Sequence, residues 1–350
     1  MFLQNLTVDL ESTLTTIKMK KISFPLIVAL LLCIIFTLIG YDTLTTRKES
    51  QKYREQKQDN SSETVTSVSS NTPVIYCIGD SLTLGEKSAS YPTALSSLTG
   101  FSVNKFGGAQ DQSIDISIRM GKTKVYVDNI TIPSETTPVQ IQLFDKDKDK
   151  IDALKGTGSN FTTVEIDGIA GKLKYNSEKK THTFTREQKG NEKKITKLTQ
   201  IKADFPTFDS QSIAIIFTGT YDPSSENSIF RTITYQRSII SQLKTKKYIV
   251  VSLTSKRKFD IVDSMNTVLK EEHKEHFLDF RKYLLNNGLK DANITPTNQD
   301  KKDLQNKLIP SSLLKEDKLN GNSKFNQLLA EQIIQKMIDL KYITEKDIQS

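Results

Sequence analysis

The chain has 350 residues, 36% hydrophobic and 26% charged, so it is long enough for more than one folded unit and too balanced to be wholly disordered. Two cysteines and three histidines are too few for a zinc cluster of Cys and His. The net charge of +8 would suit an acidic partner, but the lysines are spread along the chain, as on an ordinary solvated surface. We therefore expect no nucleic-acid partner.

The uncharged run at 22–41, ISFPLIVALLLCIIFTLIGY, has the length that a helix needs to cross a bilayer. Lysines precede it, so the positive-inside rule places residues 1–21 in the cytoplasm and the large C-terminal part outside. A cleaved signal peptide starting at Met19 is the alternative, although no small-x-small cleavage site follows the run. We expect an uncleaved single-pass anchor in the cell membrane, as on Gram-positive surface proteins.

Residues 42–73 consist mainly of Gln, Ser, Thr, Asn and Lys and contain almost nothing to bury. This composition predicts a flexible stalk between the membrane segment and a folded part. The folded part is then expected to work in the inner cell wall.

Short apolar runs then alternate with helical patterns. The runs lie at 74–78, 212–218, 248–253 and 276–280, and the helical patterns at 91–98, 229–243, 261–272 and 322–340. This alternation predicts an α/β domain, formed by 74–121 and 206–350, with a parallel sheet covered on both faces. Ligands of such sheets bind at the carboxyl ends of the strands.

The alternation of strand and helix patterns stops at residues 122–205. This segment contains short β patterns separated by turns rich in Lys, Asp, Gly and Asn. They predict a small antiparallel β domain inserted into the α/β domain. Its DKDKDKID segment (145–152) lacks the glycine and terminal glutamate of an EF-hand loop, so we expect an exposed charged hairpin rather than a calcium site.

The motif GDSLTLG (Gly79–Gly85) follows the first apolar run, where a serine at a sharp strand exit points its hydroxyl into the ligand cleft. In this motif the chain resembles the SGNH, or GDSL, hydrolase family. The resemblance implies a three-layer flavodoxin-like sandwich, with Ser81 as the nucleophile, its N–H in the oxyanion hole and Asp80 beside the substrate.

Of the other three family blocks, the second fits and the last two are altered. FGGAQ implies Gly108 as an oxyanion donor in a loop after the second strand, with Gly107 or Ala109 as alternatives. GTYD (Gly219–Asp222) places Tyr221 where the family has asparagine, and Gly219 beside the substrate. Near the C-terminus, Asp317 stands at the catalytic acid and Asn320 at the histidine position. An asparagine cannot accept the serine proton as a general base does.

No other histidine offers an obvious replacement. His182 lies in the β insertion and would have to reach over the cleft, although a strand-surface position is the ordinary interpretation. His273 and His276 lie at the end of a polar helix and the start of a strand, where exposure is expected. The sequence contains no dinucleotide fingerprint, P-loop or metal-ligand cluster, so we expect no cofactor and no metal.

Three functions remain open. The first is an acyl esterase acting on a cell-wall glycan or polymer through Ser81. The second is a catalytically inactive relative that binds a glycan or an anionic wall polymer, with Tyr91 and Tyr221 stacking on sugar rings. The third is a scaffold whose β insertion binds a protein partner. A fold is compatible with all three, because function resides in the site.

Overall fold

A computed structural model describes residues 73–85, 90–158, 163–223, 226–254 and 259–348. The described residues all belong to one compact unit. The predicted membrane run at 22–41 and nearly all of the predicted stalk lie outside the described residues. Within the described part of the chain, no helix is both long enough and apolar enough to span a bilayer.

The α/β part is built on a six-stranded sheet with the order β14-β13-β12-β1-β2-β6. Five of these strands are parallel, and β6 pairs antiparallel with β2 at the edge. The strands are β1 (Ile75–Gly79), β2 (Val103–Ala109), β6 (Thr157–Gly158), β12 (Ile213–Phe217), β13 (Tyr248–Val251) and β14 (Phe277–Leu278). Numbered along the chain, the parallel strands have the order 2-1-3-4-5, which is that of flavodoxin-like sheets.

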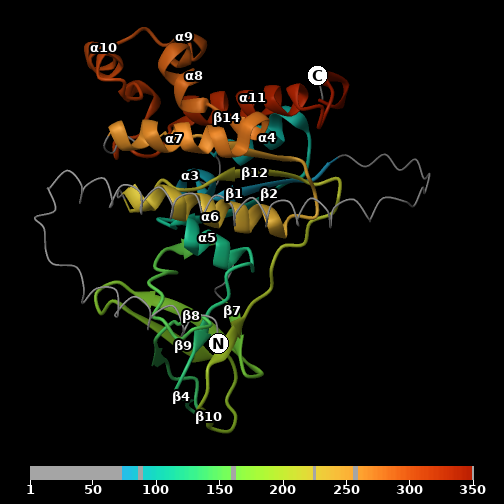
Figure 1. The fold of residues 1–350 in the computed structure, drawn as a ribbon, viewed down its shortest axis with the longest axis vertical. Coiled ribbons are helices and arrows are strands. Elements are labelled where there is room, and N and C mark those ends of the chain that lie inside the picture. The colour runs from blue at the N-terminus through green and yellow to red at the C-terminus, as the bar shows by residue number, and fades with distance from the viewer. Residues whose placement is uncertain (1–72, 86–89, 159–162, 224–225, 255–258, 349–350) are drawn as a thin grey trace, which may run out of the picture. The chain divides into compact units, whose positions relative to one another are not determined.

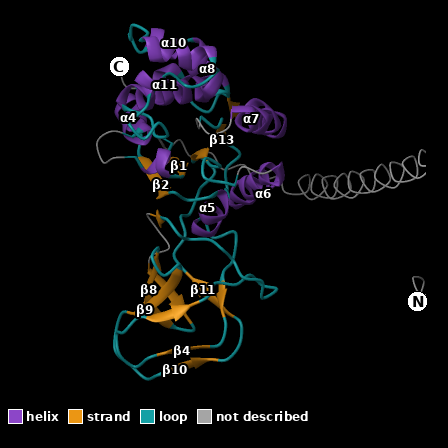
Figure 2. Cartoon of the chain, turned by 90° about the vertical axis from the view of Figure 1, so that its left-hand side faces the viewer, coloured by secondary structure: helices purple, strands orange, loops and turns teal. Residues whose placement is uncertain are grey.

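Helices cover both faces of this sheet. They are α3 (Ser81–Leu84), α4 (Tyr91–Thr99), α5 (Ser113–Arg119), α6 (Glu226–Gln242), α7 (Phe259–His273), α8 (Phe280–Asn286), α9 (Gly288–Asp291), α10 (Asn298–Gln305) and α11 (Ser323–Asp339). Figures 1 and 2 show α4 and α11 on one face and α5 and α6 on the other. The predicted three-layer arrangement around a parallel sheet is therefore present.

The central strand β12 shows why the chain forms these layers. All five of its residues, IAIIF, are buried. Ile213, Ile215 and Phe217 pack in the core beneath α4 and α11, whereas Ala214 and Ile216 pack with residues of α5 and α6. A strand with apolar side chains on both faces is stable only when both faces are covered, as the continuous apolar run predicted.

The segment between β2 and β12 contains an antiparallel sheet, as predicted. Its strand order is β3-β11-β7-β8-β9-β5, and β4 pairs separately with β10. The strands are β3 (Tyr126–Val127), β4 (Ile130–Ile132), β5 (Val139–Ile141), β7 (Thr163–Ile166), β8 (Ile169–Asn176), β9 (Thr181–Arg186), β10 (Lys193–Ile195) and β11 (Thr199–Lys202). Their buried side chains form a core that also includes Ile114 and Ile118 of α5.

The charged segment at 145–152 forms a tight turn. Phe144 bridges Lys150 in antiparallel fashion, and the Asp145 carboxylate accepts hydrogen bonds from the backbone N–H groups of Asp147 and Asp149, both at 2.9 Å. Among the described residues, no cluster of His, Cys, Asp and Glu has the arrangement of a metal site. The carboxylate therefore stabilises its own turn.

Candidate functional site

The carboxyl ends of β1 and β12 meet where the strand order reverses. From β1 the chain continues to β2 on one side, and from β12 it continues to β13 on the other. The loops therefore diverge, which is where ligands bind in open α/β sheets. Ser81 follows β1, Tyr221 follows β12, and their hydroxyl oxygens lie 2.7 Å apart.

Local sequence fixes the position of Ser81. A Cβ atom on Gly79 would lie 2.2 Å from Thr83 Oγ1 and 2.3 Å from the Phe217 carbonyl oxygen, so only glycine allows β1 to end this close to β12. Asp80 then caps the short helix α3 by accepting a hydrogen bond from the Leu82 N–H at 2.9 Å. As a result, Ser81 begins α3 at the edge of the cleft.

A chain of hydrogen bonds leads from Ser81 to Asp317. The Ser81 hydroxyl donates to Asn320 Oδ1 at 3.2 Å, and Asn320 Nδ2 donates to Asp317 Oδ2 at 2.6 Å. A carboxylate only accepts, so the bond to Asp317 fixes which end of the amide faces the serine. The structure thus brings together the three residues that the sequence placed at nucleophile, base and acid.

The single proton of the serine hydroxyl determines which residue donates in the hydrogen bond between Ser81 and Tyr221. A serine hydroxyl has one proton, and here it is directed at Asn320. In the 2.7 Å contact the Tyr221 hydroxyl is therefore the donor and Ser81 Oγ the acceptor. This arrangement holds the serine as a neutral alcohol, because neither neighbour takes its proton.

Asp317 is held in its charged form. Partial burial acts against ionisation, but hydrogen bonds from the Asn320 side chain and from the backbone N–H groups of Leu319 and Asn320 keep the pKa of Asp317 below its usual value. In a serine hydrolase such a carboxylate orients the base and stabilises its positive charge. Here it orients a neutral amide instead.

His182 does not reach the serine. Its Nε2 lies 3.2 Å from the Leu154 carbonyl oxygen, and its ring lies against Tyr175 with 4.9 Å between centroids. Burial lowers the pKa of His182, so the ring is neutral near pH 7. The hydrogen bonds of the Ser81 hydroxyl with other described residues go to Tyr221 and Asn320.

The other two histidines stabilise the fold elsewhere. His273 is 3% exposed, and its Nε2 lies 2.8 Å from Gln236 Oε1, so the predicted exposure is wrong for this residue. Burial lowers its pKa to about 4. His276 is half-buried, and its Nδ1 lies 2.8 Å from the Tyr342 hydroxyl. Neither histidine can act as a base on Ser81.

Two predicted substrate contacts are wrong. Tyr91 is completely buried in the core, with its hydroxyl 3.1 Å from Thr83 Oγ1, so its ring cannot stack on a sugar. Asp80 is also completely buried, and burial raises its pKa to about 7. Its carboxylate caps α3 and does not face a ligand.

The two predicted glycines take different places. Gly108 lies within β2 and pairs with Gly158 of β6, not in a loop after the strand as expected. A Cβ atom there would lie 1.8 Å from Asp111 Oδ2, so the position requires glycine. Gly219 follows β12 with φ of +112°, a conformation that favours glycine, and it directs the chain toward Tyr221.

Asp222, the last residue of GTYD, has a structural role. Its Oδ1 accepts a hydrogen bond from the Ser113 N–H at 2.7 Å, and its Oδ2 accepts one from the Thr232 hydroxyl. These bonds join the loop after β12 to the start of α5 and to α6. They hold Tyr221, the preceding residue, beside Ser81.

A cavity of about 320 Å³ lies beside Tyr221. Its other walls come from the β2–α5 connection and from a segment of the β insertion, and the residues are Gln110, Gln112, Asp115, Asp152, Ala153, Lys155 and Gly156. No sequence motif marks these residues, because they belong to segments that come together only in the folded chain. The insertion thus supplies one wall of the candidate site.

Buried polar contacts fasten that wall. Arg119 of α5 forms an ion pair with Asp111 at 2.6 Å, with both side chains at least 93% buried, and also donates to the Gly156 carbonyl oxygen at 3.3 Å. The Leu154 N–H donates to the Asp115 carboxylate. Burial raises the pKa of Asp115 to about 6. The cavity wall is therefore tied to the α/β sheet by groups that are costly to separate.

No family model matches the chain. A search of curated proteins likewise found no match. Among solved structures, the chain is similar to "a putative lipolytic protein of G-D-S-L family" from Desulfitobacterium hafniense DCB-2, at 14% sequence identity and a TM-score of 0.39. The match covers 76% of this chain and 99% of the other.

Proposed function

We propose that this chain is a membrane-anchored surface protein of SGNH-hydrolase type that binds an acylated cell-wall glycan or wall polymer at the Ser81 site without hydrolysing it. One observation carries the proposal. The Ser81 hydroxyl donates to the amide oxygen of Asn320, at the position where the family resemblance implies a histidine base. The site keeps the hydrolase arrangement and lacks its proton acceptor.

The chemistry of that contact disfavours turnover. Attack by serine on an ester requires its proton to leave as the new bond forms, and an amide oxygen is far too weak a base to receive it. Loss of the histidine from a catalytic triad costs a factor of about 10⁶ in kcat. Asp317 is bound to Asn320 rather than to Ser81, so it does not replace the base directly.

Ligand binding is supported by the walls of the cavity beside Tyr221. Gln110 and Gln112 line the cavity with amide groups, and Lys155 and Asp152 line it as an ion pair at 2.5 Å. Such groups suit a hydroxyl-rich ligand. The location outside the cell rests on the uncharged run at 22–41 and the lysines before it.

Absence of turnover is tested with the full chain in detergent micelles. We expect Ser81 not to react with a fluorophosphonate probe, and p-nitrophenyl acetate hydrolysis to be the same for wild type and Ser81→Ala. Probe labelling of the wild type that Ser81→Ala abolishes would overturn the proposal.

Ligand binding is tested separately with O-acetylated chitotriose. Saturation-transfer NMR should show the acetyl methyl signal with the wild type, and Ser81→Phe should remove it by filling the site. Gln299→Ala, on α10, is the control and should leave the signal unchanged. Equal signals from wild type and Ser81→Phe would place the ligand elsewhere and contradict the proposal.

A slow serine esterase is the second candidate. It is favoured by the spatial order of Ser81, Asn320 and Asp317, which is that of nucleophile, base and acid. Tyr221 would then donate a hydrogen bond to the oxyanion, in the role that asparagine has in the family. The probe experiment above distinguishes the candidates, because only an esterase forms a covalent adduct at Ser81.

A further inference from the structure

The β insertion contains a second cavity, of about 520 Å³, lined entirely by its own residues. The walls come from β5, from the start of β9, from the β3–β4 connection and from the turn at 144–152. None of these residues is part of the Ser81 hydrogen-bond chain. Asp152 alone lines both this cavity and the one beside Tyr221.

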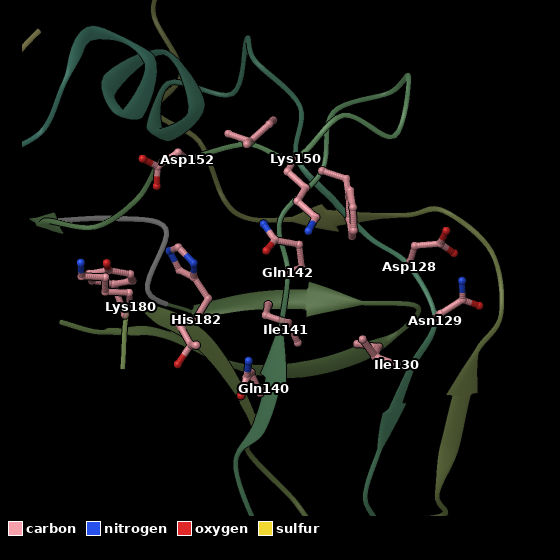
Figure 3. A pocket seen from close by; sticks show the side chains of 14 residues that line it. Asp128, Asn129, Ile130, Gln140, Ile141, Gln142, Lys150, Asp152, Lys180 and His182 are labelled. Carbon is pink, nitrogen blue, oxygen red and sulfur yellow. The ribbon is translucent and has the colours of Figure 1, made fainter. Parts of the chain in front are cut away.

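Three amide side chains, Asn129, Gln140 and Gln142, line the cavity. Gln142 Nε2 donates to the Leu143 carbonyl oxygen, which leaves its Oε1 as an acceptor. In the described part of the chain no hydrogen bond engages the side chains of Asn129 and Gln140. Amides both donate and accept, so they match the hydroxyl groups of a polyol or sugar. In Figure 3, Gln142, Lys150 and His182 point toward a common space.

The lining contains two carboxylates and two lysines, and both carboxylates pair with further lysines outside it. Asp128 is paired with Lys148 at 2.8 Å, and Asp152 with Lys155 at 2.5 Å; neither lysine lines this cavity. Lys150 and Lys180 do line it, and within the described residues neither has an ion-pair partner. With the two outside lysines included, four lysines face two carboxylates at the cavity, and this excess of positive charge favours an anionic group.

An aromatic wall completes the cavity. Tyr175 and His182 both line it, with their rings in contact. Burial lowers the pKa of His182, so the pair presents uncharged rings. A ring face packs against the C–H face of a polyol or sugar. The whole insertion is also basic, with sixteen Lys and Arg against twelve Asp and Glu between residues 122 and 205.

From these features we infer that the β insertion binds a phosphate-bearing polyol or sugar in this cavity. Lys150 and Lys180 bind the phosphate, and the three amides bind the hydroxyl groups. This site is additional to the proposed binding at Ser81 and does not depend on it, because its residues belong to a different sheet.

The test measures binding to the full chain in detergent micelles by titration calorimetry, with glycerol 3-phosphate, inorganic phosphate and glycerol as probes. Glycerol 3-phosphate should bind more tightly than either of the others, because it alone satisfies both lysines and amides. Lys150→Gln combined with Lys180→Gln should weaken its binding about tenfold, since each exposed charge contact contributes a factor of a few. Gln140→Ala should weaken the binding of glycerol 3-phosphate and leave the binding of inorganic phosphate unchanged.

The matched control is Lys172→Gln combined with Lys174→Gln. These exposed lysines lie on β8 and do not line the cavity, so the net charge changes equally but binding should not. Equal weakening by both double variants would mean that only overall charge matters and would overturn the inference. Equal affinity for phosphate and glycerol 3-phosphate would overturn the polyol assignment. Ser81→Phe should leave this binding unchanged, which separates the result from the proposed function.

Discussion

Asn320 joins Ser81 to Asp317 through the two ends of one amide, with its oxygen 3.2 Å from Ser81 Oγ and its nitrogen 2.6 Å from Asp317 Oδ2. A histidine between the same partners would accept from the serine at one nitrogen and donate to the aspartate at the other. The proposed absence of hydrolysis therefore depends first on residue 320. Changing that residue is the most direct test of the site.

Asn320→His should introduce esterase activity. An imidazole placed between Ser81 and Asp317 can take the serine proton, and a positioned general base contributes a factor of about 10²–10⁴. Hydrolysis of p-nitrophenyl acetate should rise through about pH 6.5, as the imidazole loses its proton. The control is the same substitution in a Ser81→Ala background, which should show no such rise. Activity that persists in the control would come from the imidazole itself and would contradict this interpretation.

Tyr221→Asn in the Asn320→His background should raise the rate further. The Tyr221 hydroxyl now hydrogen bonds with Ser81 Oγ, whereas an asparagine amide at this position would be available to an oxyanion. One oxyanion donor contributes a factor of about 10²–10³ in well-studied enzymes. Tyr221→Phe in the same background removes the hydroxyl without adding a donor, so kcat should be lower than with asparagine. If both variants give the same kcat, residue 221 does not face the oxyanion.

Stability should fall as the pH rises because of Asp80. Burial raises its pKa from 3.8 to about 7, so between those values the folded chain binds a proton that the unfolded chain does not. The free energy of unfolding therefore decreases from about pH 4 to about pH 7, by about 4 kcal/mol at most.

Asp80→Asn should remove most of that slope and increase stability at pH 7, because asparagine keeps the cap on α3 without a buried charge. Urea denaturation at several pH values measures the free energy of unfolding. The control is Asp204→Asn, at an exposed position. Asp115, whose pKa burial raises to about 6, should leave a slope of its own over the narrower range from about pH 4 to about pH 6. An unchanged slope in Asp80→Asn would exclude Asp80 as its source.

Arg119→Met should destabilise the protein by about 3–5 kcal/mol, because it leaves the Asp111 carboxylate buried without its partner. Arg237→Met is the matched control. Its ion pair with Glu272 at 2.6 Å is largely exposed on the arginine side, so the loss should be about 1 kcal/mol or less. Urea denaturation of both variants gives the comparison. Similar losses of stability in the two variants would show that burial does not increase the contribution of the Arg119–Asp111 ion pair to the free energy of unfolding.

The parallel sheet and its helices could be predicted because their signals are local. The all-apolar runs that became β1 and β12 and the helical patterns that became α4 and α11 lie within a few residues of their predicted limits. The position of Ser81 at a strand exit was also local, since Gly79 and Asp80 are its neighbours in sequence. The proximity of Ser81 and Asn320 was predicted from the spacing of the family's sequence blocks. No local physical signal in the chain indicates it.

Burial of single polar side chains was not predictable in this way. Tyr91 and His273 were expected at a cleft and on an exposed surface, and both lie in the core. Gln236 accepts a hydrogen bond from His273, and the Tyr91 ring lies against that of Phe217, with 6.3 Å between centroids. Gln236 and Phe217 are too far from these residues in sequence to leave a local pattern.

The sequence by itself determined the α/β class, the β-rich character of the insertion, and the asparagine at residue 320, where the family resemblance implies a histidine. Only the tertiary structure decided that Tyr221 donates to Ser81, that Asp80 is a buried cap, and that the insertion forms a wall of the site and holds a cavity of its own. Secondary structure follows from side-chain periodicity over about ten residues. Sites and buried charges depend on which distant segments the folded chain brings within a few ångströms of one another.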